Sequence, residues 1–224
     1  MQEVTLEDIL RILHDSREDN SISRVNNRLE EILILTGAER KSEESWRVDR
    51  VLRIELALKA VSLGEAIEGV VNLLTWKDFE GFIADIMQRH NYRCVESFRK
   101  RGTGDTKGME IDVIGVRGKE IMSIDAKMWG HRGGKASALK TAAEKQKERT
   151  SRLCSLLPRL SKKINGLQEG IYSLKPIIVT WMVEEVAFSD GVPIVPIFKL
   201  NSFLQDMPMY EDLIAVSKCE FSHQ

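Results

Sequence analysis

Three charged residues near the middle of the chain, Asp112, Asp125 and Lys127, have types and spacing that would support phosphodiester hydrolysis. Apolar and polar residues alternate over 110–116 and again over 120–128, which predicts two β-strands. Side chains alternate between the two faces of a strand, so Asp125 and Lys127 share one face. Two nearby carboxylates repel each other, and Mg²⁺, which binds a few carboxylates together with water, relieves that repulsion.

The turn between these strands decides how the two carboxylates meet. A turn centred on Gly118 and Lys119 places Asp112 directly opposite Asp125. A turn centred one residue earlier places Asp112 opposite Ser123, with Asp125 on the diagonal. In both registers the two carboxylates lie on one face of the hairpin.

Lys127 would project beside a metal held by these carboxylates. Its positive charge would stabilise an attacking water or the charge that develops on phosphorus, while the metal lowers the pKa of the water and polarises the phosphate. The pattern therefore predicts metal-assisted phosphodiester hydrolysis. The alternative is that Asp125 and Lys127 form a surface ion pair on an edge strand and face Asp112 by chance.

A fourth candidate, Glu80, lies on the helix predicted before these strands. Thr75 and Asp78 form a capping-box pattern that starts this helix at Trp76, and the periodic pattern continues to about Arg89. At 100° per residue, Glu80 lies on the flank of the apolar stripe, from which its carboxylate can face a cleft. The alternative is that Glu80 borders the core and reaches water.

The other periodic segments predict an α/β fold with two parts. Residues 1–72 show helical periodicity, a polar loop at 38–45 and no strand pattern, which predicts a small all-helical N-terminal domain. Residues 73–224 combine helices with strand-like segments, which lie at 93–98, 110–116, 120–128, 176–183 and 192–198. Helices on both sides of this strand pattern indicate a layered α/β domain.

Basic residues gather near the acidic cluster, although the net charge of the chain is only −1. Residues 1–72 hold ten Lys and Arg against fifteen Asp and Glu, and the rest of the chain holds 23 against 19. Residues 130–152 alone carry seven Lys and Arg against two Glu. Basic strips of this kind suit nucleic acid phosphates, or else form a solvated helix face and a flexible loop. The candidate nucleic-acid-binding residues are Arg99, Lys100, Arg101, Lys107, Lys145, Gln146 and Arg149, with Arg152 on the same predicted helix.

The cysteines and the apolar segments indicate the cellular compartment in which the protein is expected. The three cysteines are scattered and odd in number, which predicts neither a disulfide framework nor a zinc site and indicates a reducing cytosol. The longest apolar runs are far shorter than a membrane helix requires, and the N-terminus lacks a signal-peptide pattern. We therefore expect a cytoplasmic protein without a membrane partner or an organic cofactor.

Three segments of the chain resemble the PD-(D/E)XK nuclease superfamily: WKDFEGFIADIMQRHNYRC, GMEIDVIGV and EIMSIDAKMW. Among its members the chain is most similar to Mrr-like restriction endonucleases and archaeal Holliday-junction resolvases, over about residues 76–203. The resemblance implies a restriction-endonuclease-like mixed central β-sheet flanked by helices. In that family a helical Glu, an Asp on the hairpin and a (D/E)-x-K motif bind one or two Mg²⁺ ions, and the matching positions are Glu80, Asp112, Asp125 and Lys127. Ile111 stands where the family name would place a proline.

The resemblance implies a metal-dependent endonuclease that hydrolyses DNA phosphodiester bonds, of the restriction or repair type. Its cofactor would be Mg²⁺, with Mn²⁺ able to substitute, and it would act as a homodimer that addresses two strands. The alternatives are a non-catalytic nucleic-acid-binding or regulatory protein on the same scaffold, and a resolvase of branched DNA. Residues 1–72 would serve in DNA binding, partner interaction or dimerisation, and their acidic balance argues against broad phosphate contact.

Overall fold

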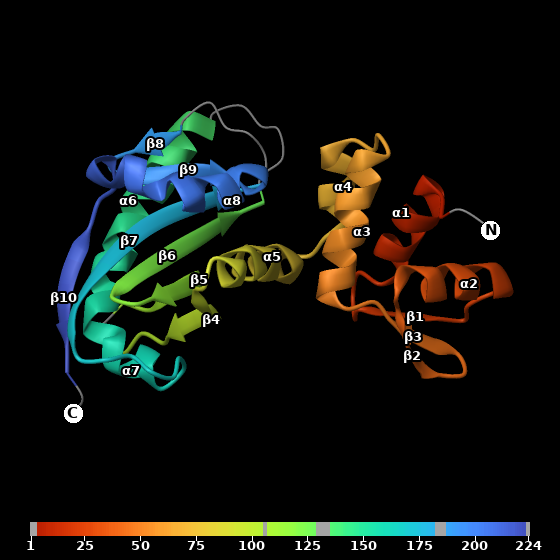
Figure 1. The fold of residues 1–224 in the computed structure, drawn as a ribbon, viewed down its shortest axis with the longest axis horizontal. Helices are drawn as coiled ribbons and strands as arrows, with labels where there is room; N and C mark the ends of the chain where they lie inside the picture. Colours follow the sequence, from red (N-terminus) through yellow and green to blue (C-terminus); the bar gives the residue numbers. More distant parts are fainter. Residues whose placement is uncertain (1–3, 105–106, 129–134, 182–186, 223–224) are drawn as a thin grey trace. The chain divides into compact units, whose positions relative to one another are not determined.

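The computed structural model describes residues 4–104, 107–128, 135–181 and 187–222. The chain forms two compact units, Met1–Phe82 and Ile83–Gln224, called the first and the second unit below (Figure 1). Helix α5 (Trp76–Arg89) contains the division between them, whereas the sequence places the domain boundary after residue 72. None of the helices in the described ranges combines the length and the apolar character needed to cross a membrane.

The first unit is mainly helical but also contains a small β-sheet. Its helices are α1 (Leu6–Asp15), α2 (Asn27–Thr36), α3 (Arg50–Ser62) and α4 (Ile67–Leu73), followed by the start of α5. Its antiparallel sheet has the order β1-β3-β2 and is formed by β1 (Ser21–Ser23), β2 (Glu39–Ser42) and β3 (Ser45–Arg47). This sheet corrects the prediction of an all-helical domain. Strands of three or four residues are too short to show period-two hydrophobicity, and every residue of β2 is exposed.

A buried arginine joins the helices of the first unit. Arg53 on α3 is fully buried and donates hydrogen bonds to the carbonyl oxygens of Leu13 (2.9 Å) and Leu73 (2.6 Å). It also donates to Ser16 Oγ (2.5 Å) and to Asp78 Oδ2 (3.1 Å). The guanidinium thus satisfies four acceptors from three segments, the end of α1, the end of α4 and the start of α5, in the interior of this unit.

The second unit contains a mixed β-sheet of the order β4-β5-β6-β7-β9-β8. Neighbouring strands are antiparallel from β4 to β6 and parallel from β6 through β7 to β9, and β10 pairs with the first half of β7. The strands are β4 (Arg93–Lys100), β5 (Met109–Arg117), β6 (Glu120–Lys127), β7 (Gly170–Thr180), β8 (Phe188–Ser189), β9 (Val192–Pro196) and β10 (Ser217–Phe221). The predicted α/β fold with a mixed central sheet flanked by helices is therefore confirmed.

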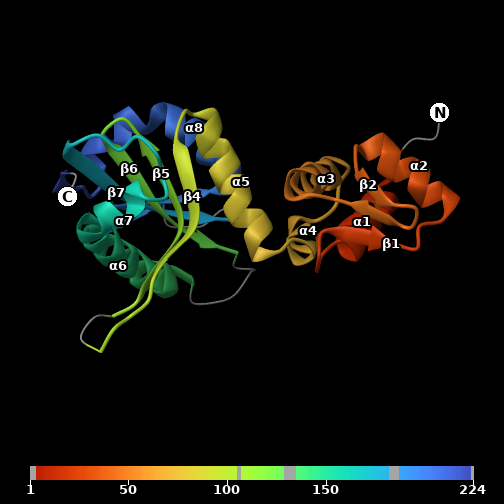
Figure 2. The ribbon, with the colours of Figure 1, turned by 90° about the horizontal axis from the view of Figure 1, so that it is seen from below.

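Helices cover both faces of this sheet (Figure 2). On one face, Met87 of α5 packs against β5 at Gly115, where an added Cβ would lie 2.3 Å from the Met87 Cε. α8 (Ile197–Asp206) lies beside α5, and His90 Nε2 is 2.8 Å from Asn201 Oδ1. The opposite face carries α6 (Lys135–Leu153), the short turn η1 (Cys154–Leu156) and α7 (Leu157–Ser161), and the turn η2 (Met207–Leu213) follows α8.

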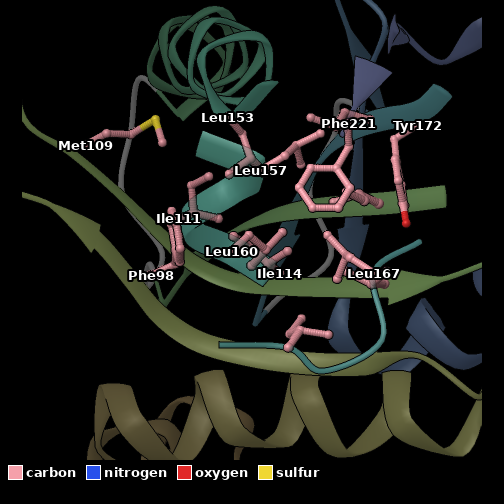
Figure 3. Close-up of a cluster of buried hydrophobic side chains, with 14 residues drawn as sticks. Phe98, Met109, Ile111, Ile114, Leu153, Leu157, Leu160, Leu167, Tyr172 and Phe221 are labelled. Atoms are coloured by element: carbon pink, nitrogen blue, oxygen red, sulfur yellow. The ribbon is translucent and has the colours of Figure 1, made fainter. Parts of the chain in front are cut away.

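The main apolar core lies between the sheet and the α6–α7 side (Figure 3). Leu153, Leu157 and Leu160 from the helical side are fully buried against Ile111 and Ile114 of β5. Because this cluster anchors the C-terminal end of α6, it also determines which side of that helix faces the strands.

A disulfide between Cys154 of η1 and Cys219 of β10 lies at the margin of this core. The sequence predicts no disulfide, and this prediction is wrong. The two cysteines are 65 residues apart, and it is the pairing of β10 with β7 that brings them together. In the described part of the chain, the remaining cysteine, Cys94, is half-buried and free, and burial raises the pKa of its thiol to about 12.

Candidate active site

The hairpin of β5 and β6 turns at Gly118 and Lys119, which is the first of the two predicted registers. The strand pairing ends with Val113 opposite Ile124, and Asp112 and Asp125 are the next residues beyond that pair on the two strands. The Ala126 amide donates a hydrogen bond of 2.8 Å to Asp112 Oδ2. The Asp112 carboxylate is thereby held against the backbone of β6, beside Asp125.

Asp125 is almost completely buried, with 3% of its surface exposed, on a strand in the interior of the sheet. Lys127 Nζ lies 2.6 Å from Asp125 Oδ2, and Arg149 Nη1 donates a hydrogen bond of 2.8 Å to Asp125 Oδ1. The Oδ2 contact has no hydrogen-bond geometry, and within the described ranges Oδ2 has no hydrogen-bond partner. The alternative of a surface pair on an edge strand is therefore excluded. A buried carboxylate is costly unless cations compensate it, and here two do so.

Helix α6 presents two different faces to this hairpin and to solvent. The face that is buried against the sheet carries Leu139, Ala143, Gln146, Thr150 and Leu153. Residues spaced three or four apart share a helix face, and the neighbouring, more exposed face carries Lys145, Glu148, Arg149 and Arg152.

Gln146 is fully buried and does not lie on a nucleic-acid-binding surface, which corrects the sequence-based prediction. Its Nε2 donates hydrogen bonds to Ser123 O (2.7 Å) and Ser123 Oγ (3.0 Å). Ser123 lies two residues before Asp125 and shares its strand face. The Gln146 contact therefore holds α6 against β6 and fixes the position of the helix along the strand, which places Arg149 next to Asp125. The sequence contained one signal for this contact, namely the position of Ser123 on the same strand face as the candidate site.

A cavity of about 530 Å³ lies on the exposed side of α6. Seven basic side chains line it, together with two acidic ones: Arg99, Lys100, Arg101, Lys107, Lys145, Arg149 and Arg152, with Glu110 and Glu148. We call this the basic cavity. It brings together two segments that are far apart in sequence, and six of the seven predicted nucleic-acid-binding residues line it. Part of the predicted basic strip, residues 130–134, lies outside the described residues.

The wall of the basic cavity opposite α6 comes from the ends of β4 and β5. Figure 2 shows both strands extending beyond the rest of the sheet on the side of α6. Within this wall Arg99 Nη2 pairs with Glu110 Oε1 at 2.6 Å, and across the cavity Arg152 donates a hydrogen bond to the Lys107 carbonyl oxygen. These contacts connect the strand extension to α6.

Glu80 is buried in α5, with 4% of its surface exposed, so the alternative that it reaches water is wrong. It belongs to the first unit, whereas Asp112, Asp125, Lys127 and Arg149 belong to the second. Its participation in the site stays a prediction.

No protein family model matches the chain. An uncharacterized protein from Archaeoglobus fulgidus is 27% identical over 137 residues, which is 61% of this chain and 95% of that protein. Among solved structures, protein VC1899 from Vibrio cholerae aligns with a TM-score of 0.35 and 13% identity, over 93% of this chain and 51% of that one. The protein of unknown function AF1548 aligns with a TM-score of 0.28 and 20% identity, over 52% and 55%. The chain therefore matches about half the length of each solved structure, at a similarity that carries no functional argument.

Proposed function

We propose that the second unit is a Mg²⁺-dependent endonuclease that hydrolyses DNA phosphodiester bonds. The observation that carries this proposal is the acidic pair just beyond the last paired residues of β5 and β6, where the Ala126 amide binds Asp112 and Lys127 Nζ lies 2.6 Å from Asp125. Arg149 links this cluster to the basic cavity, since it contacts Asp125 and also lines the cavity. A pair of acidic residues that can hold a metal, next to a basic cavity that can hold phosphates, suits metal-assisted phosphodiester hydrolysis.

The residues present fit a Mg²⁺ ion. Within the described ranges no group of three or more His, Cys, Asp or Glu gathers as a complete protein cage. Mg²⁺ is commonly held by one or two carboxylates, with waters and substrate phosphates completing its coordination. Asp112 and Asp125 would supply the protein's share, and the buried Asp125 Oδ2 has no hydrogen bond that the metal would have to replace. When bound, Mg²⁺ or Mn²⁺ would activate water and polarise the scissile phosphate.

Each side chain in the cluster has a distinct role in this proposal. Lys127 is partly exposed, with 19% of its side chain accessible, and provides a positive charge for the phosphate that undergoes attack. The Ala126 amide orients Asp112 through its hydrogen bond. The basic cavity binds the flanking phosphates of the DNA backbone, which fixes the position of the strand without selecting a sequence.

The proposal retains three further expectations from the sequence. These are membership of the PD-(D/E)XK nuclease superfamily with Glu80 as an additional metal ligand, action as a homodimer, and a cytoplasmic location, where a DNA substrate would be available.

The decisive experiment compares cleavage of linear duplex DNA by wild type, Asp112→Asn and Lys127→Met in the presence of Mg²⁺ or Mn²⁺. Asparagine keeps an oxygen acceptor for the Ala126 amide, so Asp112→Asn removes charge with little change in shape. We expect each variant to lose about 100-fold or more in rate, as is typical when one stabilising group is removed from such a site. Calorimetry with Mn²⁺ would show weaker metal binding by Asp112→Asn.

Matched controls come from an ion pair of the second unit that lies outside the site. Lys147 Nζ pairs with Asp190 Oδ2 at 3.0 Å, and both side chains are about half exposed. Asp190→Asn and Lys147→Met make the same chemical changes there and should cleave at the wild-type rate. Cleavage at the wild-type rate by both site variants would refute the assignment, and the absence of Mn²⁺ uptake by wild type would favour a non-catalytic scaffold.

A further inference from the structure

Arg149 is shared between the candidate metal site and the basic cavity. Its Nη1 donates a hydrogen bond of 2.8 Å to Asp125 Oδ1, and the same side chain lines the cavity. One third of its side chain is accessible, compared with 4% for that of Asp125. The guanidinium therefore has an anionic partner on the buried side and faces open, basic space on the other.

Both oxygens of Asp125 are adjacent to cations. Arg149 contacts Oδ1, and Lys127 Nζ lies 2.6 Å from Oδ2. The Arg149 contact is a charge-assisted hydrogen bond, the stronger class of hydrogen bond in proteins, whereas the Lys127 contact lacks hydrogen-bond geometry. A divalent cation at Asp125 Oδ2 would be repelled by the positive charge that Arg149 places on the same carboxylate, and a cation that also took Oδ1 would have to displace the guanidinium.

Two other arginines of the basic cavity, Arg99 and Arg152, have partners within its own walls. Arg99 pairs with Glu110 at 2.6 Å, and Arg152 lies 3.6 Å from Glu148. Arg149 instead bridges the cavity wall and the carboxylate of the candidate site. A phosphate in the cavity would offer two oxygens to the planar Arg149 guanidinium, a bidentate contact for which arginine is better suited than lysine.

We propose that Arg149 is a positioning residue that couples DNA binding to metal binding, an inference that rests on the proposed function. With the basic cavity unoccupied by phosphate, Arg149 holds Asp125 Oδ1 and weakens metal binding. A backbone phosphate in the cavity draws the guanidinium away and leaves Asp125 free to bind the metal. Because coupling between two ligands is reciprocal, the metal strengthens DNA binding by the same factor.

The test measures Mn²⁺ affinity by calorimetry, without and with a saturating short duplex that carries phosphorothioate linkages to resist hydrolysis. For wild type we expect the duplex to tighten Mn²⁺ binding about tenfold, within the range found for coupled sites. For Arg149→Met we expect Mn²⁺ binding in the absence of duplex to be about tenfold tighter than in wild type, and the duplex to add nothing further. A purely structural role for Arg149 would not make metal binding tighter.

Two controls separate coupling from loss of charge. Arg152→Met removes another arginine of the basic cavity, about one helical turn from Arg149, and should weaken duplex binding but keep the coupling. Lys147→Met removes a positive charge from another face of α6 and should change neither quantity. Arg149→Lys keeps the charge but loses the bidentate geometry, so it should retain only part of the coupling. This intermediate result would exclude misfolding of Arg149→Met as the reason for its loss of coupling.

The possible outcomes distinguish this inference from the proposed function. If wild type binds Mn²⁺ with the same affinity with and without the duplex, or if Arg149→Met matches wild type without it, the coupling is refuted while the metal site stands. If wild type binds no Mn²⁺ under either condition, the proposed function fails, and the coupling fails with it.

Discussion

Replacement of the buried Arg53 by methionine is expected to destabilise the first unit severely. Methionine fills part of the space of the arginine stem but donates no hydrogen bond. Asp78, with 2% of its side chain accessible, would lose its ion-pair partner and become an uncompensated buried charge. The carbonyl oxygens of Leu13 and Leu73 and the hydroxyl of Ser16 would lose a donor as well.

The magnitude follows from the burial of both partners. Breaking a fully buried ion pair by removing one member costs about 3–5 kcal/mol, and each buried acceptor left without a donor adds to that cost. These contributions are not additive, so we expect a loss of about 4 kcal/mol or more for Arg53→Met. Since whole domains are stable by only about 5–15 kcal/mol, this variant would be close to unfolding at room temperature.

A double-mutant cycle with Asp78→Asn isolates the charge contribution. Asparagine removes the buried negative charge and keeps an acceptor for the Thr75 amide, which now donates to Asp78 Oδ2 at 2.8 Å. Arg53→Met combined with Asp78→Asn should therefore be less destabilised than the sum of the single variants, by about 1–3 kcal/mol.

The assay is urea denaturation followed by circular dichroism and tryptophan fluorescence. Arg28→Met is the matched control, because Arg28 belongs to the same unit, is 64% accessible and lies 3.4 Å from Asp8. This exposed pair should contribute less than about 1 kcal/mol. The reasoning would be refuted if Arg53→Met lost no more stability than Arg28→Met, or if the effects of Arg53→Met and Asp78→Asn were additive.

Two further predictions concern the second unit. Burial lowers the pKa of Lys175, but hydrogen bonds to Glu120 and Glu211 outweigh this effect and raise the pKa above its ordinary value. The stability that this lysine contributes is therefore present below about pH 10.4 and is lost as the pH rises through the raised pKa. The unfolding free energy of wild type in urea should therefore fall more steeply above about pH 10 than that of Lys175→Met, and equal slopes would contradict this. The Cys154–Cys219 disulfide spans 65 residues, and its reduction should lower the unfolding free energy by up to about 4 kcal/mol. Alkylation of all three cysteines in native protein without reductant would show that the bond is absent.

Local spacing was sufficient to predict the elements that carry the candidate site. The capping box of Thr75 and Asp78 starts α5 at Trp76 as expected, with hydrogen bonds in both directions. Asn91, two residues after this helix, is in the left-handed conformation, with φ of 64°, which asparagine adopts more readily than most residues. The strand patterns at 110–116 and 120–128 also located β5 and β6, although six of the eight residues of β6 are buried, on both of its faces.

The structure was needed wherever two segments distant in sequence meet. Cys154 and Cys219 are brought together by the pairing of β10 with β7, which no spacing pattern encodes. The three short strands of the first unit depend on mutual pairing rather than on hydrophobic periodicity, so they were read as loop and helix.

The charged cluster at the centre of the proposed function shows both contributions. Asp125 and Lys127 share a strand face because they are two residues apart, and this follows from the sequence alone. Gln146 and Arg149 are three residues apart on α6 and lie on the same side of the helix, but the sequence does not determine that this side faces β6. Packing of α6 on the core buries Gln146 against β6 and directs Arg149 to Asp125. Once the opposing strands are in place, only one rotation of the helix about its axis buries its apolar side chains.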